Sequence, residues 1–257
     1  MQALTLPARR GVGWLFEGFG IYRKKPWLLS LLVSGYWILM GLILSVPWLG
    51  QIVAPLLVPA FSVSLMNACR LVAQDEALPP LLLFSGFKRN VRLLLQLGVT
   101  YILLCLFLIG IISLFDGGTL FRLFVEGERP GREAMEGNQL MFLVWLIVFF
   151  VPVMIAYWFS PMLVAWNGLP VGKSLFFSVV ACLRNWRAFI VYVVSVYFFA
   201  TVLLVVVNIL LATLFAGAGE AGAGMLLMLI LMVVFPAAYA SFYVSYCDVF
   251  VTIDDAA

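Results

Sequence analysis

The chain contains no histidine, and only 11% of its 257 residues are charged. Histidine is the commonest metal ligand in proteins and the commonest general base near neutral pH. Its absence removes the main support for a metallo-enzyme or a histidine-dependent hydrolase, and we expect neither a metal site nor a cofactor. A soluble domain carries about 25% charged residues, so the low charge and a mean hydropathy of +1.14 indicate a protein of the lipid bilayer.

Cysteine is also scarce, and none of the four cysteines belongs to a Cys-x-x-Cys pair. Cys69, Cys105, Cys182 and Cys247 lie inside or at the ends of apolar stretches, so we interpret them as reduced interior residues rather than disulfide partners or metal ligands. No nucleophile stands in a pattern with an orienting base, and the short connections leave no room for a separate soluble domain. The sequence therefore predicts a protein that is not an enzyme.

Lysine, arginine, aspartate and glutamate are missing from five long stretches of the chain. An ionised side chain at the bilayer centre costs about 2.5 to 3.5 kcal/mol, so such stretches predict membrane spans. A span needs about 20 residues, and the stretch 26–69 is long enough for two, with a break at Pro47–Gly50. We expect an all-α polytopic membrane helical bundle that forms a single domain over residues 1–257. Its six predicted spans cover approximately residues 27–46, 51–70, 93–115, 140–165, 188–214 and 224–247.

The positive charges predict the orientation. Lys and Arg number five before the first span, four between spans 2 and 3, and three between spans 4 and 5. The connection 116–139, between spans 3 and 4, holds the other three of the 15. Because Lys and Arg are enriched in cytoplasmic connections, the side with twelve is expected in the cytoplasm. The sequence thus predicts a multi-pass protein of a bacterial inner (plasma) membrane with cytoplasmic N- and C-termini.

Three segments on the predicted cytoplasmic side resemble one another. Each has an aromatic-rich amphipathic stretch, then a basic cluster, then a span; Arg89-Asn90-Val91-Arg92 and Arg184-Asn185-Trp186-Arg187 match closely. We therefore expect three pseudo-repeated hairpins, in units of about 11–70, 80–166 and 171–250. The amphipathic stretches predict cytoplasmic interfacial helices at about 11–22, 80–87 and 171–182.

Prolines recur in every even-numbered span. A proline bends a membrane helix and frees a backbone carbonyl, which is tolerated where neighbouring helices satisfy the backbone. The even-numbered spans are therefore expected to be the inner helices of the bundle. These prolines are Pro55, Pro59, Pro152, Pro161 and Pro236.

Several motifs carry a family resemblance: LVPAFSVSLMNACR at 57–70, FSGFKRN at 84–90, and the runs 6–32 and 160–189. Over nearly its whole length the chain resembles an uncharacterised family of beta-proteobacterial six-span inner-membrane proteins. It is more distantly similar to the membrane domains found ahead of some bacterial glycerophosphodiester phosphodiesterases, although their soluble catalytic barrel has no counterpart here. The resemblance implies a fold and a location, and it brings no activity.

The basic clusters are candidate sites for anionic lipid head groups. Arg89, Arg92, Arg184 and Arg187 could form a collar, since each basic residue near an anionic membrane surface contributes about 1 kcal/mol. The alternative is that they determine topology alone. Asn90 and Asn185 could cap helices or bond across the bundle, and capping is the favoured interpretation.

Polar groups inside the spans are candidates for a transport path. Such a path needs polar groups near the midplane beside broken helices, which points to Asn208, Tyr239 and Pro152. Interhelical hydrogen bonds would explain the same residues. Ion-coupled transport has little support, because no ionisable Asp, Glu, Lys or Arg lies near the middle of a span.

Two functions are consistent with this sequence. The first is a non-enzymatic role in membrane organisation or assembly, with membrane lipids and unidentified proteins as partners and no nucleic acid. The alternative is a permease for an apolar or amphipathic small molecule, with its path between the proline-bent helices.

Overall fold

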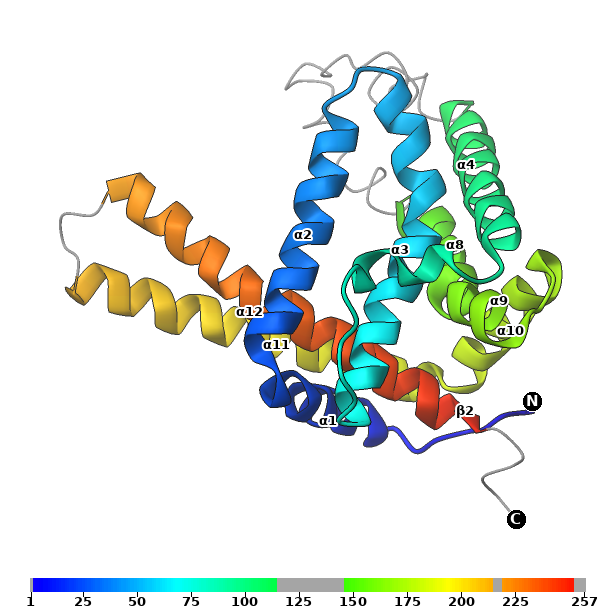
Figure 1. Ribbon diagram of the computed structural model, residues 1–257. Helices are drawn as coiled ribbons and strands as arrows, with labels where there is room; N and C mark the ends of the chain where they lie inside the picture. The colour runs from blue at the N-terminus through cyan, green and yellow to red at the C-terminus, as the bar shows by residue number, and fades with distance from the viewer. Residues whose placement is uncertain (1, 115–145, 215–218, 252–257) are drawn as a thin grey trace.

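The computed structural model describes residues 2–114, 146–214 and 219–251, and these residues are mostly helical (Figure 1). Five of the described helices are long and apolar enough to cross a membrane. They follow the charge-free stretches closely, and the predicted all-α polytopic membrane bundle is confirmed. The five are α2 (Pro26–Leu44), α3 (Leu49–Ala73), α4 (Val91–Ser113), α11 (Trp186–Leu214) and α12 (Gly219–Val249).

The region of the fourth predicted span is not one continuous helix. A π-helical turn, η3 (Leu146–Phe150), leads into α8 (Val151–Trp158), and the chain breaks at Phe159 before α9 (Ser160–Asn167). The expectation of a single helix ending at 165 is thus corrected, while residues 140–145 lie outside the described part. Pro152 and Pro161 stand in the first turns of α8 and α9, where a missing N–H does least harm. The count of six spans stays a prediction.

Shorter helical segments precede three of the long helices. They are α1 (Arg10–Lys24) before α2, η1 (Leu82–Phe87) before α4, and α10 (Val171–Arg184) before α11. Their positions agree with the predicted interfacial helices. The second is a short 3-10 helix, and its Gly86 is pressed so closely against α3 that a Cβ there would overlap the carbonyl group of Ala60.

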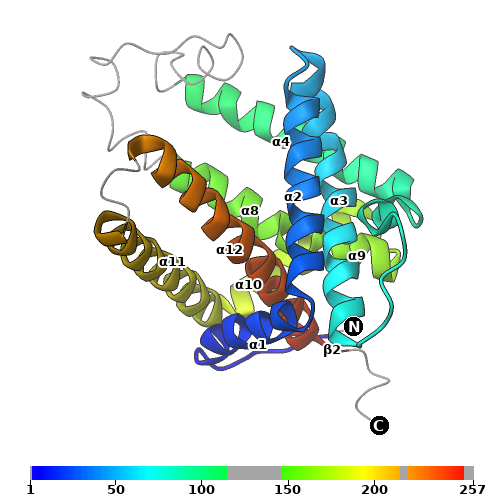
Figure 2. The same ribbon diagram turned by 60° about the vertical axis from the view of Figure 1, so that its left-hand side comes forward.

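These short segments pack in a cyclic pattern. The α1 helix packs on α11 and α12, η1 packs on α3, and α10 packs on α8 and α9. Each short segment therefore contacts the proline-containing helix of the hairpin before it, and α1 closes the ring by contacting the last hairpin. Figure 2 shows α1 lying across one end of α11 and α12. The order of elements follows the expected one, and the three repeat units themselves stay a prediction.

The two ends of the described chain meet at this end of the molecule. Strand β1 (Gln2–Ala3) pairs antiparallel with β2 (Phe250–Val251), and the N–H of Leu4 donates to the carbonyl of Val249 at 3.0 Å. The largest buried cluster lies beside them and contains the fully buried Trp14 and Phe159. The α2–α3 and α11–α12 hairpins diverge from this base in both views.

We refer to the end formed by residues 2–25, 70–92 and 167–187 as the basic side. It carries the twelve lysines and arginines that lie outside the 116–139 connection. Away from it, the long helices present apolar side chains that the protein does not cover, such as Leu103 and Phe107 on α4 and Phe198 on α11. Such surfaces are expected where helices face lipid rather than water.

Candidate functional site

The proline-containing helices border a hollow in the middle of the bundle, which we call the central groove. It has a volume of about 470 Å³ and is lined by α3, α8, α9 and α12, with further side chains from α2, α4 and α11. Pro55, Pro59 and Pro161 all lie in its wall. A groove of this size is in the usual range for small-molecule sites. The bent helices thus surround a space that could hold a ligand.

At the helix break beside the groove, the hydroxyl of Ser178 on α10 takes the place of a missing backbone hydrogen bond. In an unbroken helix the N–H of Phe159 would donate to the carbonyl of Ile155. Instead this N–H donates to Ser178 Oγ at 3.0 Å, and the Ser178 hydroxyl donates to the Ile155 carbonyl at 2.8 Å. A hydroxyl inserted into a helix in this way produces a kink. The angle between α8 and α9 is therefore controlled by a side chain of a different helix.

The groove wall is mainly apolar and contains a few polar groups. The Tyr157 hydroxyl donates to the carbonyl of Leu97 at 3.2 Å, and the hydroxyls of Tyr192 and Ser241 lie 2.7 Å apart. Tyr239 and Ser62 also line the groove. Their hydroxyls make no hydrogen bond with the described residues, so they could serve a ligand.

Trp158 adds an unpartnered donor to the same wall. Within residues 2–114, 146–214 and 219–251, its indole Nε1 is the one buried side-chain nitrogen or oxygen without a hydrogen-bond partner. The rings of Phe189 and Phe242 contact this indole edge-on, with centroids 5.6 and 5.3 Å away. A buried donor without an acceptor is uncommon and calls for an explanation. An acceptor atom of a bound molecule could supply the partner if these rings moved.

The structure separates the three residues of the predicted polar path. Tyr239 lines the central groove. Pro152 lies in the first turn of α8 and is exposed, outside the groove wall. Asn208 is exposed on α11, and its amide donates to the carbonyl of Leu204 in its own helix at 2.7 Å. The three are not brought together at one site, and a transport role for any of them stays a prediction.

The four arginines of the predicted lipid collar are exposed on the basic side, without an acidic partner among the described residues. The Arg187 guanidinium lies over the ring of Trp186, 5.3 Å from its centroid, and Arg184 donates to the carbonyl of Ala3 at 3.3 Å. Arg89 and Arg92 flank the start of α4. Their charges are available to anions, and lipid binding at all four stays a prediction.

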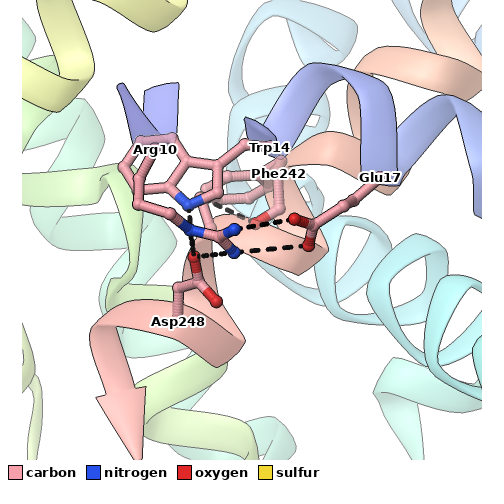
Figure 3. A network of polar contacts seen from close by, with 6 residues as sticks. Arg10, Trp14, Glu17, Phe242 and Asp248 are labelled. Atoms are coloured by element: carbon pink, nitrogen blue, oxygen red, sulfur yellow. Dashed lines mark hydrogen bonds and ion pairs between the residues drawn. The ribbon is translucent and has the colours of Figure 1, made fainter. Parts of the chain in front are cut away.

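Arg10 forms a charged cluster with acidic residues from α1 and α12 (Figure 3). Its guanidinium donates to Glu17 Oε1 at 2.7 Å, and its Nε donates to Asp248 Oδ2 at 2.7 Å. The same Asp248 oxygen accepts a hydrogen bond from Trp14 Nε1 at 2.8 Å. The hydrogen bond to Glu17 raises the pKa of Arg10 above its ordinary value, against the opposing effect of burial. Each carboxylate in the cluster is paired with Arg10, and the cluster is a tie between helices rather than a ligand site.

Asn90 and Asn185 do not cap the helices that follow them, which corrects the favoured interpretation. Neither side chain bonds to the first turn of its helix. The amide of Asn90 donates at 3.1 Å to the carbonyls of Val164 and Ala165, near the end of α9. The amide of Asn185 donates to the carbonyl of Leu4 at 2.8 Å, while its oxygen accepts from the N–H of Leu6 at 2.8 Å. Both asparagines bond across the bundle.

Other polar side chains in the apolar runs also form hydrogen bonds between helices. Asn67 donates to Ser85 Oγ at 3.0 Å and accepts from Trp166 Nε1 at 2.9 Å. Asn167 donates to the hydroxyl of Tyr246 at 2.9 Å. Such bonds are expected for polar residues in otherwise apolar runs, because an unpaired polar group there would be costly.

The described residues offer no metal centre, because no three His, Cys, Asp or Glu side chains among them come together. The four cysteines are free, with Cys69 and Cys182 buried, Cys105 half-buried and Cys247 exposed. Burial raises the pKa of Cys182 in α10 to about 12, so this thiol stays protonated and unreactive.

Among known proteins, the chain is similar to a probable inner membrane protein of Burkholderia thailandensis. The two are 33% identical over 255 residues, which cover 96% of this chain and 93% of the relative. The chain belongs to the family of this inner membrane protein. No protein-family model matches the chain, and no solved structure matches it.

Membership of this inner-membrane family confirms part of the expected resemblance. The protein is an integral inner-membrane protein, and neither its relative nor the described side chains indicate an enzymatic activity. The more distant likeness to phosphodiesterase membrane domains stays a prediction.

Proposed function

We propose that the protein is a non-enzymatic permease for an apolar or amphipathic small molecule, which it binds in the central groove. The observation that carries the proposal is the groove itself, of about 470 Å³, where the proline-containing helices meet. If the proline-containing helices were tightly packed, there would be no space for a substrate between them, and the permease hypothesis would lose its support. Ligand sites in membrane transporters commonly lie near the middle of the bilayer beside broken helices.

The lining defines the ligand chemistry. Most of the wall is aromatic, aliphatic or proline, which favours a hydrocarbon or aromatic body. The free hydroxyls of Tyr239 and Ser62 and the unpartnered indole of Trp158 would hydrogen-bond a small uncharged polar group. The wall contains no Asp, Glu, Lys or Arg, so an ionic substrate would lack a counter-charge.

The break at Phe159 supplies an element that can move. Helices α8 and α9 meet there in the groove wall, and the Ser178 hydroxyl takes the place of the missing backbone bond between Phe159 and Ile155. A change in the angle between the two helices would alter the groove without breaking a regular helical bond. Hinges of this kind are common in proteins that change shape around a ligand.

A role in membrane organisation or assembly is the second candidate. Its support is the set of exposed arginines on the basic side that have no acidic partner among the described residues. These would attract anionic lipids or an acidic protein. Stoichiometric co-purification of a partner protein, together with a failure of the groove to bind amphiphiles, would favour this role.

We also propose that both termini lie in the cytoplasm. The pairing of β1 with β2 brings residues 2 and 251 together, which requires an even number of crossings between them. Twelve of the 15 lysines and arginines lie in the segments that share this side. A total of six crossings requires that residues 140–167 cross the membrane once. Helices α8 and α9 would form most of that crossing.

The permease proposal can be tested by filling the groove. Val58 lines the groove, whereas Val99 on α4 is similarly exposed but lies outside it. Purified protein in lipid nanodiscs is titrated with 1-O-decylglycerol, a neutral amphiphile, and saturable binding is measured by calorimetry. We expect the wild type and Val99→Phe to bind alike and Val58→Phe to bind at least about tenfold more weakly.

A hydroxyl deletion tests the polar part of the site. Tyr239→Phe should weaken binding by about two- to tenfold, the value of one hydrogen bond. Tyr197→Phe removes a hydroxyl from an exposed tyrosine outside the groove and should have no effect. Equal, non-saturable partitioning of the amphiphile into all variants would overturn the proposal.

A further inference from the structure

A second hollow lies at the edge of the bundle, away from the central groove. It has a volume of about 310 Å³ and is formed by α2, α3 and the η1 segment, so we call it the η1 pocket. Only apolar residues line it, and none of them lines the central groove. Its floor is buried and includes Leu29, Ala68 and Leu82. The pocket therefore offers a ligand mainly hydrocarbon contact.

The rim of the η1 pocket consists of apolar side chains that the protein leaves uncovered. Leu31 is 71% exposed and Leu81 is 72% exposed. Leu81 also has a φ of +63°, a left-handed conformation that is unfavourable for a leucine. Strained residues of this kind often lie at ligand sites. An exposed leucine held in this conformation is better accounted for by contact with hydrocarbon than by contact with water.

Two positively charged side chains directly follow the η1 segment. Lys88 and Arg89 directly follow η1, are exposed, and have no acidic partner among the described residues. At the start of α2, by contrast, Lys24 pairs with Asp75 at 2.8 Å and Lys25 donates to the carbonyl of Glu76 at 2.8 Å. Lys88 and Arg89 therefore offer unpaired positive charge next to η1, where we place the polar head of a lipid in the pocket.

A similar pocket occupies the corresponding place on the last hairpin. It has a volume of about 340 Å³ and lies between α1, α11 and α12, with Phe19 and Ala237 among its apolar lining. In both cases an interfacial segment covers the junction of a long helix with the proline-containing helix that follows it. Two hollows with the same surroundings indicate a feature of the architecture rather than a local packing defect.

We propose that the η1 pocket binds one acyl chain of an anionic phospholipid from the leaflet on the basic side. The chain lies on the floor of Leu29, Ala68 and Leu82, and the phosphate lies at Lys88 and Arg89. The pocket under α1 is its counterpart. This lipid site is separate from the permease site, and it holds the η1 segment against α3 rather than supplying a transported molecule.

Gly35 allows the η1 pocket to be filled without disturbing the fold. A Cβ at Gly35 would meet only Leu83 Cδ2, at the ordinary contact distance of 3.9 Å, so a leucine there would occupy the pocket. Gly41 is the matched control on the same helix, since a Cβ there would meet nothing within 4 Å. Both changes replace a helical glycine by leucine, and only one of them fills the pocket.

The readout is photo-crosslinking in nanodiscs with phosphatidylglycerol that carries a diazirine in its acyl chain. Crosslinks to residues 78–84 are quantified by mass spectrometry against crosslinks to lipid-facing residues 103–107 of α4. We expect the wild type and Gly41→Leu to crosslink equally at 78–84, and Gly35→Leu to lose about tenfold. Unchanged crosslinking in a folded Gly35→Leu would overturn the proposal.

The head-group contact has its own test, which does not depend on Gly35→Leu being folded. Lys88→Gln combined with Arg89→Gln changes only exposed side chains and should reduce the crosslink yield about fivefold or more. Lys173→Gln, on α10, should leave it unchanged. A phosphatidylcholine probe with the same acyl chain should give a several-fold lower yield in the wild type. Equal yields from the two lipids would exclude an anionic occupant, whatever the outcome at the central groove.

Discussion

The indole nitrogen of Trp14 donates a hydrogen bond of 2.8 Å to Asp248 Oδ2, across 234 positions of the chain. The bond joins the first helix to the end of the last long helix, and Arg10 binds the same carboxylate oxygen (Figure 3). Trp14 is fully buried, and its ring contacts those of Phe189 and Tyr192 on α11. The N-terminal helix is thus a structural part of the bundle and not a loosely attached membrane anchor.

Replacing this tryptophan tests its structural role. Trp14→Phe keeps an aromatic ring but removes the bond to Asp248 and leaves unfilled space, so we expect the free energy of unfolding to fall by about 1 to 3 kcal/mol. Thermal unfolding in detergent measures the effect. Trp27→Phe is the control, because Trp27 is 87% exposed on α2, and its unfolding temperature should match that of the wild type. Equal stability of the two variants would contradict a structural role for α1.

The close approach of α1 to α12 gives a second prediction. A Cβ at Gly18 would overlap the backbone of Ser241, whereas a Cβ at Gly20 would meet nothing within 4 Å. Gly18→Ala should therefore force α1 away from α12 and cost about 1 to 3 kcal/mol of stability. Gly20→Ala should leave stability unchanged or raise it by up to about 1 kcal/mol, since alanine favours a helix. Thermal unfolding curves of the two variants measure the difference. If Gly18→Ala is as stable as the wild type, α1 and α12 are not in close contact at this position.

The Ser178 bridge can be removed with one substitution. Ser178→Ala removes the hydrogen bonds that the hydroxyl makes with the N–H of Phe159 and with the carbonyl of Ile155. We expect the free energy of unfolding to fall by about 1 to 3 kcal/mol. Ser174→Ala in the same helix removes a buried hydroxyl that bonds only within α10, to the carbonyl of Val171, and should cost less. Hydrogen exchange at residues 155–163 should rise in the first variant and not in the second. If both variants exchange alike, Ser178 does not hold the break.

Much of this fold could be predicted from the sequence, because charge is so costly in a bilayer. The charge-free run 93–115 differs by only two residues at each end from α4 (Val91–Ser113). The amphipathic stretch 171–182 likewise became α10 (Val171–Arg184). The bounds of these helices could be predicted from the length and charge of each stretch, because they are determined by residues within that stretch. The break at Phe159 was not predicted, although Pro152 and Pro161 each lie in the first turn of a helix, where proline is tolerated.

The candidate site was harder to predict, since it depends on which helix faces which. The prolines of the even-numbered spans predicted a path between these helices, and Pro55, Pro59, Pro161 and Tyr239 line the central groove. Asn208 was chosen for its polarity alone; α11 is apolar on all sides, so the pattern could not show that this residue faces away from the groove. The Ser178 bridge joins residues of separate helices, and a pattern along one segment does not reveal such contacts.

Asn185 provides a fourth test, at the N-terminus. Its side chain holds the segment before α1 through Leu4 and Leu6, and it is only 1% exposed. Asn185→Ala should release this segment, with faster hydrogen exchange at Leu6 and earlier proteolysis before Arg10. Asn208→Ala removes an exposed asparagine that bonds within its own helix and should change neither measurement. Unaltered exchange at Leu6 in Asn185→Ala would mean that the β1–β2 pairing holds the segment by itself.

Cys247 tests the proposed orientation without any engineered residue. It is the exposed cysteine of the four, and it precedes Asp248 at the charged end of α12, on the basic side. A membrane-impermeant maleimide should therefore label the protein in inverted inner-membrane vesicles and not in intact spheroplasts. Cys247→Ser should abolish the label, because Cys69 and Cys182 are buried and Cys105 is half-buried within α4. Labelling from the outside of spheroplasts would place the basic side in the periplasm and reverse the orientation inferred from the lysines and arginines.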